Sequence, residues 1–180
     1  MNKTIESLSP RQVWKHFSEI CQIPHPSGHI GEIAAYLVKF GKNLHLETEQ
    51  DAIGNVLIKK PATAGMENCP TVILQAHMDM VPQKNSDVQH DFTKDPIDAY
   101  IDGKWVTARN TTLGADNGIG MASILGVLAS DDLKHGPIEA VFTVDEETGM
   151  DGARNLQPSW LEGKILINTD SEEEGELYIG

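Results

Sequence analysis

The chain has 180 residues, of which 39% are apolar and 23% charged, and its 14 basic and 27 acidic side chains give a formal net charge of −13. This apolar fraction can fill a hydrophobic core and excludes intrinsic disorder, and the length fits one domain or part of a larger one. The acidic balance argues against nucleic acid or an anionic membrane as a partner, because both bind clusters of Lys and Arg, and it is compatible with cations.

Targeting signals and cysteine pairs are missing from the sequence. Residues 1–10 lack the apolar segment of a secretory signal, and no window approaches the roughly 18 apolar residues that a membrane span requires. We therefore expect a cytoplasmic protein. Cys21 and Cys69 form neither a disulfide framework nor a CxxC pair, so we expect ordinary, partly buried thiols.

Two amphipathic helices are predicted near the amino terminus. The first follows Ser9 and Pro10, and Ser9 is expected to cap it. Its apolar stripe consists of Val13, Phe17, Ile20 and Cys21. The second helix follows a Pro- and Gly-rich turn in which Ser27 is the expected cap. Its apolar side consists of Ile30, Ile33, Ala34, Leu37 and Val38.

Strands dominate the next part of the chain. Residues 44–49 and 55–59 are predicted to form a hairpin around a turn at 51–54. Three later runs, at 71–76, 138–144 and 164–168, are continuously apolar and short, which is typical of buried central strands. A helix is predicted between the first two of these runs, over 116–128.

The order of these elements predicts an α/β domain with a central, mostly parallel or mixed sheet flanked by helices. The carboxyl ends of its central strands should meet at one edge, where open α/β sheets bind ligands. The polar residues at this edge would be His77, Asp79, Asp116, Glu146, Glu147 and Asp170.

One histidine and several carboxylates at strand ends form a ligand set that suits Zn²⁺, Mn²⁺ or Co²⁺. His77 and Asp79 are two residues apart on an extended segment, so their side chains leave the same face and Asp79 can orient the imidazole. Taken alone, His77 could be structural and Asp116 could cap its helix. Three strand ends that all carry acids favour a metal site.

Other chemistries fit the sequence poorly. The glycines of residues 114–120 precede a helix as in a phosphate-binding loop, but their spacing differs, a lysine is missing and Asp116 would repel phosphate. A GxSxG motif is absent, and a nucleophilic Ser or Cys is disfavoured.

Four ordered motifs, at 77–82, 111–120, 145–149 and 168–170, resemble those of the co-catalytic zinc peptidases. This family includes aminoacylases, glutamate carboxypeptidases and several dipeptidases. Further segments at 21–27, 80–85, 90–96 and 171–176 resemble its bacterial Xaa-His dipeptidases. The resemblance runs essentially from end to end and implies a zinc-peptidase-like catalytic domain.

The resemblance also implies which residues bind metal. His77 and Asp170 would bind one ion, Asp116 would bridge to a second, and Glu147 would bind that second ion. A complete site would hold two divalent ions, with Zn²⁺ expected and Co²⁺ or Mn²⁺ as alternatives.

Two further residues would take part in catalysis. Glu146 would be the general base, taking a proton from a metal-activated water and passing it to the leaving amine, and Asp79 would orient His77. The implied reaction is metal-dependent hydrolysis of Xaa-His dipeptides. An aminoacylase or carboxypeptidase of the same family, or a non-catalytic truncated metal-binding relative, remains an alternative.

Members of this family are much longer chains. Residues 1–180 are therefore expected to be the N-terminal portion of the catalytic domain, incomplete at the C-terminus and without the lid or dimerisation domain and the C-terminal catalytic half. The absent half would supply a histidine ligand of the second ion, so this ion should bind weakly and the chain alone should hydrolyse peptides slowly. A homodimer is expected for the full-length family.

Overall fold

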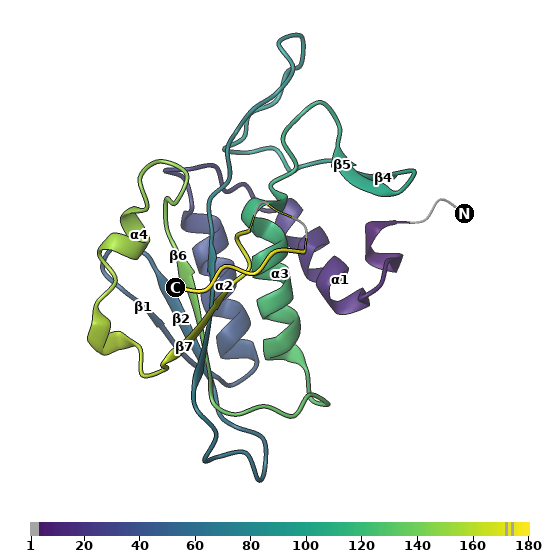
Figure 1. Ribbon diagram of the computed structural model, residues 1–180. Coiled ribbons are helices and arrows are strands. Elements are labelled where there is room, and N and C mark those ends of the chain that lie inside the picture. The colour runs from purple at the N-terminus through teal and green to yellow at the C-terminus, as the bar shows by residue number, and fades with distance from the viewer. Residues whose placement is uncertain (1–3, 172, 174) are drawn as a thin grey trace.

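The computed structural model describes residues 4–171, 173 and 175–180, so Glu172 and Glu174 of the dipeptidase-like segment at 171–176 lie outside the described residues. Its helices and strands are arranged as in Figure 1. In chain order they are η1 (Ile5–Ser7), α1 (Arg11–Cys21), α2 (Gly31–Asn43), β1 (Glu47–Gln50), β2 (Val56–Lys60), β3 (Val72–His77), β4 (Ala99–Asp102), β5 (Trp105–Ala108), α3 (Ala115–Ala129), β6 (Ile138–Thr143), α4 (Asp151–Arg154), η2 (Pro158–Trp160) and β7 (Ile165–Asn168).

Five strands form one mixed sheet in the order β1-β2-β6-β3-β7. Strand β3 pairs in parallel with both β6 and β7, whereas β1, β2 and β6 pair antiparallel. The predicted α/β class and the β1–β2 hairpin are therefore confirmed. Because β3, β6 and β7 run in the same direction, their carboxyl ends meet at one edge of the sheet, as the sequence predicts.

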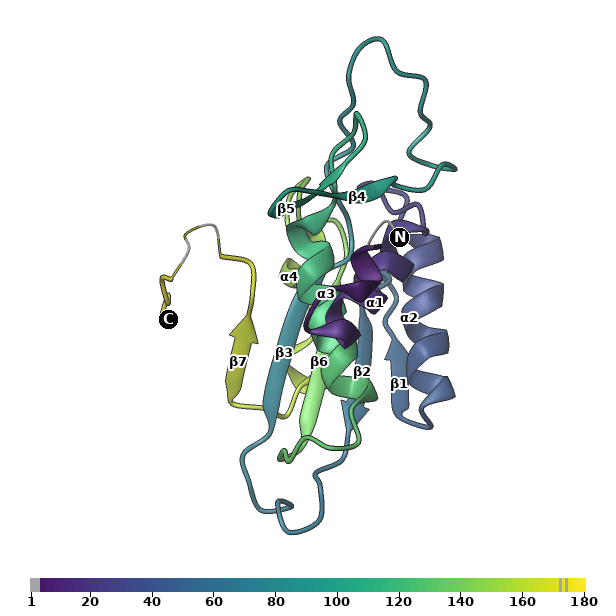
Figure 2. The same ribbon diagram turned by 90° about the vertical axis from the view of Figure 1, so that its right-hand side faces the viewer.

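The main core lies between the sheet and helices α1, α2 and α3, which gather on one of its faces (Figure 2). Helix α1 packs on α3, and α3 packs on β3. Phe17 of α1 and Phe142 of β6 are fully buried in this layer, and burial of such a side chain contributes about 1.5–3 kcal/mol. On the opposite face, a smaller core joins Leu57, Ile73 and Val141 to Leu156, Trp160 and Leu161.

Two predicted helix caps are wrong. Helix α1 has Pro10 at its N-cap position with no side-chain cap, and Ser9 contributes only its backbone carbonyl, which accepts a hydrogen bond from the indole of Trp14. Helix α2 begins at Gly31 after Ile30, and the Ser27 hydroxyl donates to Asp79 instead. A serine before a helix fits several local roles, and here long-range contacts decide which one it takes.

Strands β4, β5 and β7 lie at the periphery of the fold. β4 and β5 form a separate two-stranded ribbon, and β7 forms one edge of the main sheet. The side chains of Ile165, Leu166 and Ile167 in β7 are 47%, 56% and 48% exposed. No helix within the described residues has the length and apolarity needed to cross a membrane, and both described cysteines are free thiols.

Glu139 is a buried charge at the second position of β6, with 3% of its surface exposed. Its carboxylate accepts hydrogen bonds from the backbone N–H of Glu162, at 2.9 and 3.1 Å, and of Gly163, at 2.9 Å. Lys59 on the neighbouring β2 lies 3.9 Å away. Glu139 thus fixes the turn that leads into β7.

Replacing Glu139 with alanine is expected to lower the free energy of unfolding by about 2–3 kcal/mol, because backbone N–H groups lose a charged acceptor in a buried place. Urea denaturation measures this loss. Glu47→Ala is the matched control: Glu47 also faces Lys59, at 3.7 Å, but its side chain is 62% exposed, so we expect a loss below about 1 kcal/mol. Equal losses in the two variants would contradict this role of Glu139.

Candidate metal centre

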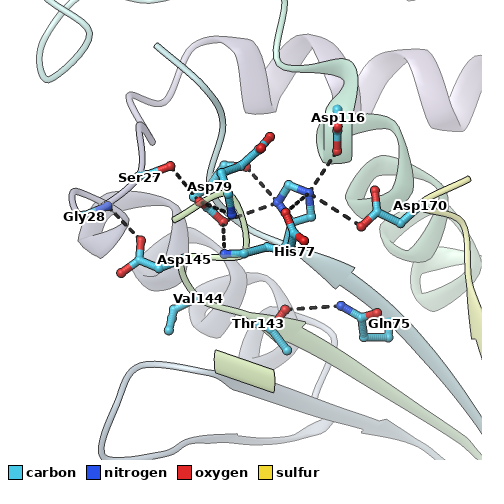
Figure 3. A network of polar contacts seen from close by, with 12 residues as sticks. Ser27, Gly28, Gln75, His77, Asp79, Asp116, Thr143, Val144, Asp145 and Asp170 are labelled. Carbon is cyan, nitrogen blue, oxygen red and sulfur yellow. Dashed lines mark hydrogen bonds and ion pairs between the residues drawn. The ribbon is translucent and has the colours of Figure 1, made fainter. Parts of the chain in front are cut away.

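The carboxyl ends of three parallel strands and the first turn of α3 converge on one side chain, His77 (Figure 3). His77 is the last residue of β3 and lies in register with Thr143, the last residue of β6. Glu146 and Glu147 follow β6, and Asp170 follows β7. The sequence-predicted residues therefore come together at the predicted edge.

The side-chain donor atoms around His77 lie close to one another. Its Nε2 atom is 2.9 Å from Asp116 Oδ1, 3.7 Å from Asp170 Oδ2 and 3.9 Å from Glu146 Oε2. Two sets have all their donor atoms within 4.8 Å, namely His77 with Asp116 and Asp170, and His77 with Glu146 and Glu147. A pocket with a volume of about 570 Å³ is lined by these four carboxylates.

The buried imidazole of His77 is held in one orientation. Its Nδ1–H donates to the backbone carbonyl of Asp79 at 2.9 Å, and Oδ1 of Asp79 lies 3.3 Å from the same nitrogen. The predicted contact between His77 and Asp79 is present. Of the two oxygens of Asp79 near Nδ1, however, the backbone carbonyl oxygen is the closer one and the carboxylate oxygen is farther away. With Nδ1 occupied, Nε2 is left to face the carboxylates, as in histidines that bind a metal through Nε2.

Asp79 is fully buried, and its carboxylate contacts other residues besides His77. Its Oδ1 accepts from the backbone N–H of Glu146 at 2.9 Å, and its Oδ2 accepts from Ser27 Oγ at 2.7 Å and from the N–H of Glu147 at 3.3 Å. Burial alone would raise the pKa of Asp79, but the hydrogen bonds from His77, Ser27 and Glu146 outweigh it and lower the pKa to about 2. One carboxylate therefore links the strand-end histidine to the loop of acids.

The clustered carboxylates of the site favour positive charge, and this shows in the pKa values of its residues. Burial would lower the pKa of His77, but its contacts with Asp79 and Asp116 and the charge of Asp170 raise it to about 9. Burial and the nearby negative charges also raise the pKa of Asp170 and of Glu147. A proton on Nε2 of His77 thus occupies the position where a cation would relieve the repulsion between the carboxylates.

Asp116 does not cap α3, although capping was one of its possible roles. The N-cap position is Gly114, at φ +70°, and Asp116 has non-helical dihedral angles (φ −85°, ψ 110°). A Cβ at Gly114 would lie 2.8 Å from the sulfur of Met80. This irregular turn brings the carboxylate of Asp116 to Nε2 of His77 while its side chain stays 69% exposed.

Sequence reasoning missed two residues that hold the site together, Ser27 and Asn55. Asn55 is fully buried and lies at the base of the loop that carries Glu146 and Glu147. Its Oδ1 accepts from the N–H of Val144 at 3.0 Å, and its Nδ2 donates to the carbonyl of Gly152 at 3.1 Å. Asn55 follows a Gly in a turn, where Asn is common, so the local sequence gave no sign of this role.

The donor set fits a divalent metal of the zinc type. It combines an imidazole nitrogen, which can bind a metal when the ring is neutral, with carboxylate oxygens. The histidine is oriented by a contact at its other ring nitrogen, Nδ1. Glu146 and Glu147 each place a carboxylate oxygen within 4.8 Å of a ring nitrogen of His77, so both carboxylates are within reach of a cation and of a reacting group. Such a centre can polarise a carbonyl and move a proton.

Comparison with known proteins relates the chain to peptidases. The sequence model of "Peptidase family M20/M25/M40" matches residues 73–175. The chain is 61% identical over 176 residues to the cytosol non-specific dipeptidase of Escherichia coli (strain K12), covering 98% of this chain and 36% of that relative. It is 31% identical over 189 residues to peptidase T of Photobacterium profundum, covering 89% of this chain and 45% of that protein.

Solved structures show the same fold. The aminoacylhistidine dipeptidase of Vibrio alginolyticus superposes with a TM-score of 0.94 at 60% identity, covering 96% of this chain and 35% of that one. The aminopeptidase PepT of Bacillus cereus superposes with a TM-score of 0.78 at 25% identity, covering 92% and 44%. The chain therefore spans about a third of the length of its most similar relatives described here.

Proposed function

Because this chain belongs to peptidase family M20/M25/M40, we propose that it forms the N-terminal portion of the catalytic domain of a metal-dependent dipeptidase. Its substrates are Xaa-His and related small dipeptides. The observation that carries the proposal is the convergence of His77, Asp116, Asp170, Glu146 and Glu147 on one point, with donor atoms within 4.8 Å in two overlapping sets.

Each ligand has a role that fits its place. His77 and Asp170 would hold one ion, Asp116 would contribute to both sites, and Glu147 would hold the second ion. When bound, two divalent ions, with Zn²⁺ expected and Co²⁺ or Mn²⁺ as alternatives, would supply Lewis-acid polarisation of the scissile carbonyl and activation of water. Asp79 keeps Nδ1 of His77 occupied, so that Nε2 is directed to the ligand position.

Glu146 is the residue that moves the proton. Its carboxylate accepts a proton from the attacking water and delivers it to the nitrogen of the leaving amine. The hydrogen bond from its backbone N–H to Asp79 holds the residue at the site, and its side chain is 32% exposed, which leaves room for substrate.

This chain covers about a third of its longer relatives, and we propose that a lid or dimerisation domain and the C-terminal catalytic half belong to the part of the complete protein that it does not cover. That half supplies a further histidine for the second ion, so residues 1–180 alone bind this ion weakly and hydrolyse dipeptides slowly. The resemblance to this family leads us to propose a homodimer for the complete protein. We also propose that it acts in the cytoplasm, and the cytosolic description of the Escherichia coli relative supports this location.

A chimera tests the proposed function. This chain replaces the matching segment of the Escherichia coli dipeptidase, to which it is 61% identical. We expect the chimera to release histidine from Xaa-His dipeptides, to lose this activity with a chelator and to regain it with Zn²⁺. N-acyl amino acids and peptides with a C-terminal glutamate test the aminoacylase and carboxypeptidase alternatives. A folded, zinc-binding chimera that hydrolyses no dipeptide, beside an active parent enzyme, would overturn the proposal.

Zinc binding to the metal-free chain is expected to depend steeply on pH. The metal needs the neutral imidazole of His77, whose pKa is raised to about 9, so binding must release a proton below that pH. We expect affinity to rise about tenfold per pH unit from about pH 7 to 9 and then to level off. Calorimetry in buffers of different ionisation enthalpy counts the released protons. A flat affinity over this range would contradict the prediction.

A further inference from the structure

The turn between α1 and α2 contacts both loops of the metal centre. Ser27 Oγ donates to Oδ2 of Asp79 at 2.7 Å, and the neighbouring backbone N–H of Gly28 donates to Oδ1 of Asp145 at 2.7 Å. Asp79 follows β3, and Asp145 precedes the two glutamates that follow β6. Two adjacent residues thus join loops that are far apart in the sequence, as Figure 3 shows.

Backbone contacts fix this turn independently of the two carboxylates. Pro26 forms an isolated parallel bridge with Met80, Ser27 N–H donates to the carbonyl of Met80 at 3.3 Å, and the N–H of Met80 donates to the carbonyl of His25 at 3.2 Å. Gly28 has φ +79°, which a glycine adopts without strain. The Ser27 hydroxyl is therefore presented to Asp79 from a rigid support.

Asp79 is the residue through which Ser27 can act. The carboxylate of Asp79 faces Nδ1 of His77 and accepts the backbone N–H groups of Glu146 and Glu147. The two oxygens of this carboxylate contact several groups at once. These contacts hold the side chain of Asp79 in one rotamer, and losing one of them would allow others. Hydrogen bonds to a charged group are also the stronger ones, at about 1.5–3 kcal/mol each.

We propose that Ser27 is a positioning residue of the metal centre. Its hydroxyl fixes the carboxylate of Asp79, and Asp79 in turn fixes the ring of His77 and the backbone of Glu146 and Glu147. This inference rests on the metal site of the proposed function. Ser27 touches neither the ligand position nor the pocket, since its contacts lie on the far side of Asp79.

Cobalt binding to the full 180-residue chain tests the proposal, with the visible absorption of Co²⁺ as the readout. Ser27→Ala is expected to lower the affinity for Co²⁺ about tenfold and to change the shape of its absorption bands, since groups that hold a metal ligand in place typically contribute about 10–100-fold to metal affinity. Ser27→Thr keeps the hydroxyl and is expected to restore affinity to within about threefold of the unchanged chain.

Ser18→Ala is the matched control. Ser18 is also half-buried and donates to a carboxylate, Glu6 Oε1, at 3.0 Å, but it lies in α1 away from the metal centre. We expect Ser18→Ala to leave both the Co²⁺ affinity and the spectrum unchanged, and thermal unfolding of all variants separates a loss of fold from a loss of positioning.

The outcomes distinguish this inference from the proposed function. Co²⁺ binding to Ser27→Ala that equals binding to the unchanged chain would overturn the positioning role and leave the metal site intact. Weak binding to both Ser27→Ala and Ser27→Thr would also overturn it, because the hydroxyl would then not be the cause. Failure of the unchanged chain to bind Co²⁺ would overturn the metal site and the inference together.

Discussion

Replacing Glu146 with glutamine is expected to lower dipeptide hydrolysis by about 10²–10⁴-fold, the usual contribution of a general base. Glutamine keeps the size and the backbone hydrogen bond to Asp79 but cannot accept the proton. The activity is measured in the chimera with the Escherichia coli relative, and the zinc affinity in the 180-residue chain. We expect the zinc affinity to change little, because Glu146 serves as base and not as ligand.

Glu147→Gln is the control for this prediction. The two glutamates are adjacent and both belong to the set around His77, but only Glu147 has the proposed role of ligand. Its substitution should weaken metal binding, and excess Zn²⁺ should restore much of the lost activity. The assignment would be contradicted if excess Zn²⁺ restored the activity of Glu146→Gln. It would also be contradicted if excess Zn²⁺ failed to restore the activity of Glu147→Gln.

Replacing His77 with alanine should have the largest effect on metal binding. Both sets of donor atoms contain His77, so its loss removes a ligand that they share. We expect the zinc affinity of the chain to fall more than about 100-fold, which exceeds the effect of about 10–100-fold expected from removing a group that only orients a ligand. Competition with a chromogenic chelator measures this affinity.

His16→Ala is the matched control for His77→Ala. His16 is also a buried histidine with a carboxylate neighbour, since it is 5% exposed and its Nδ1 lies 3.1 Å from Oε2 of Glu19. It lies in α1, so its loss should reduce stability without changing the zinc affinity. Comparable losses of affinity in both variants would mean that the binding depends on the fold in general and not on His77.

The site residues could be predicted because each lies at or just after the end of a recognisable strand, or, for Asp116, at the start of a recognisable helix. The strands ending at His77 and before Glu146 and Asp170 are short, continuously apolar runs, and such runs in an α/β chain pair in parallel. Parallel pairing places their carboxyl ends together whatever the order of the strands. Local sequence was therefore enough to bring the acids to one edge.

The supporting residues could not be predicted in the same way. Ser27 lies 52 residues from Asp79, and Asn55 lies 89 residues from Val144. Both sit in turns where Ser and Asn are common for local reasons. Their roles depend on how the sheet is ordered, with β6 between β2 and β3, and this order is set by contacts between distant segments.

Glu139 illustrates the same limit within a strand. It lies in the apolar run of β6, and a charged residue there argues weakly against a buried strand. Every residue of β6 is nevertheless buried. Its partners are backbone N–H groups of the turn at Glu162 and Gly163. The sequence shows the charge of Glu139 but does not show the backbone N–H donors for which its carboxylate is the acceptor.

The most direct test of the account is a crystal structure of the chain grown with Zn²⁺, with anomalous diffraction recorded at the zinc absorption edge. We expect a strong anomalous peak about 2.0–2.1 Å from Nε2 of His77 and within about 2.2 Å of a carboxylate oxygen of Asp116 or Asp170. Zinc bound at other side chains, or no zinc beside an ordered His77, would contradict the central claim that these residues form a metal centre.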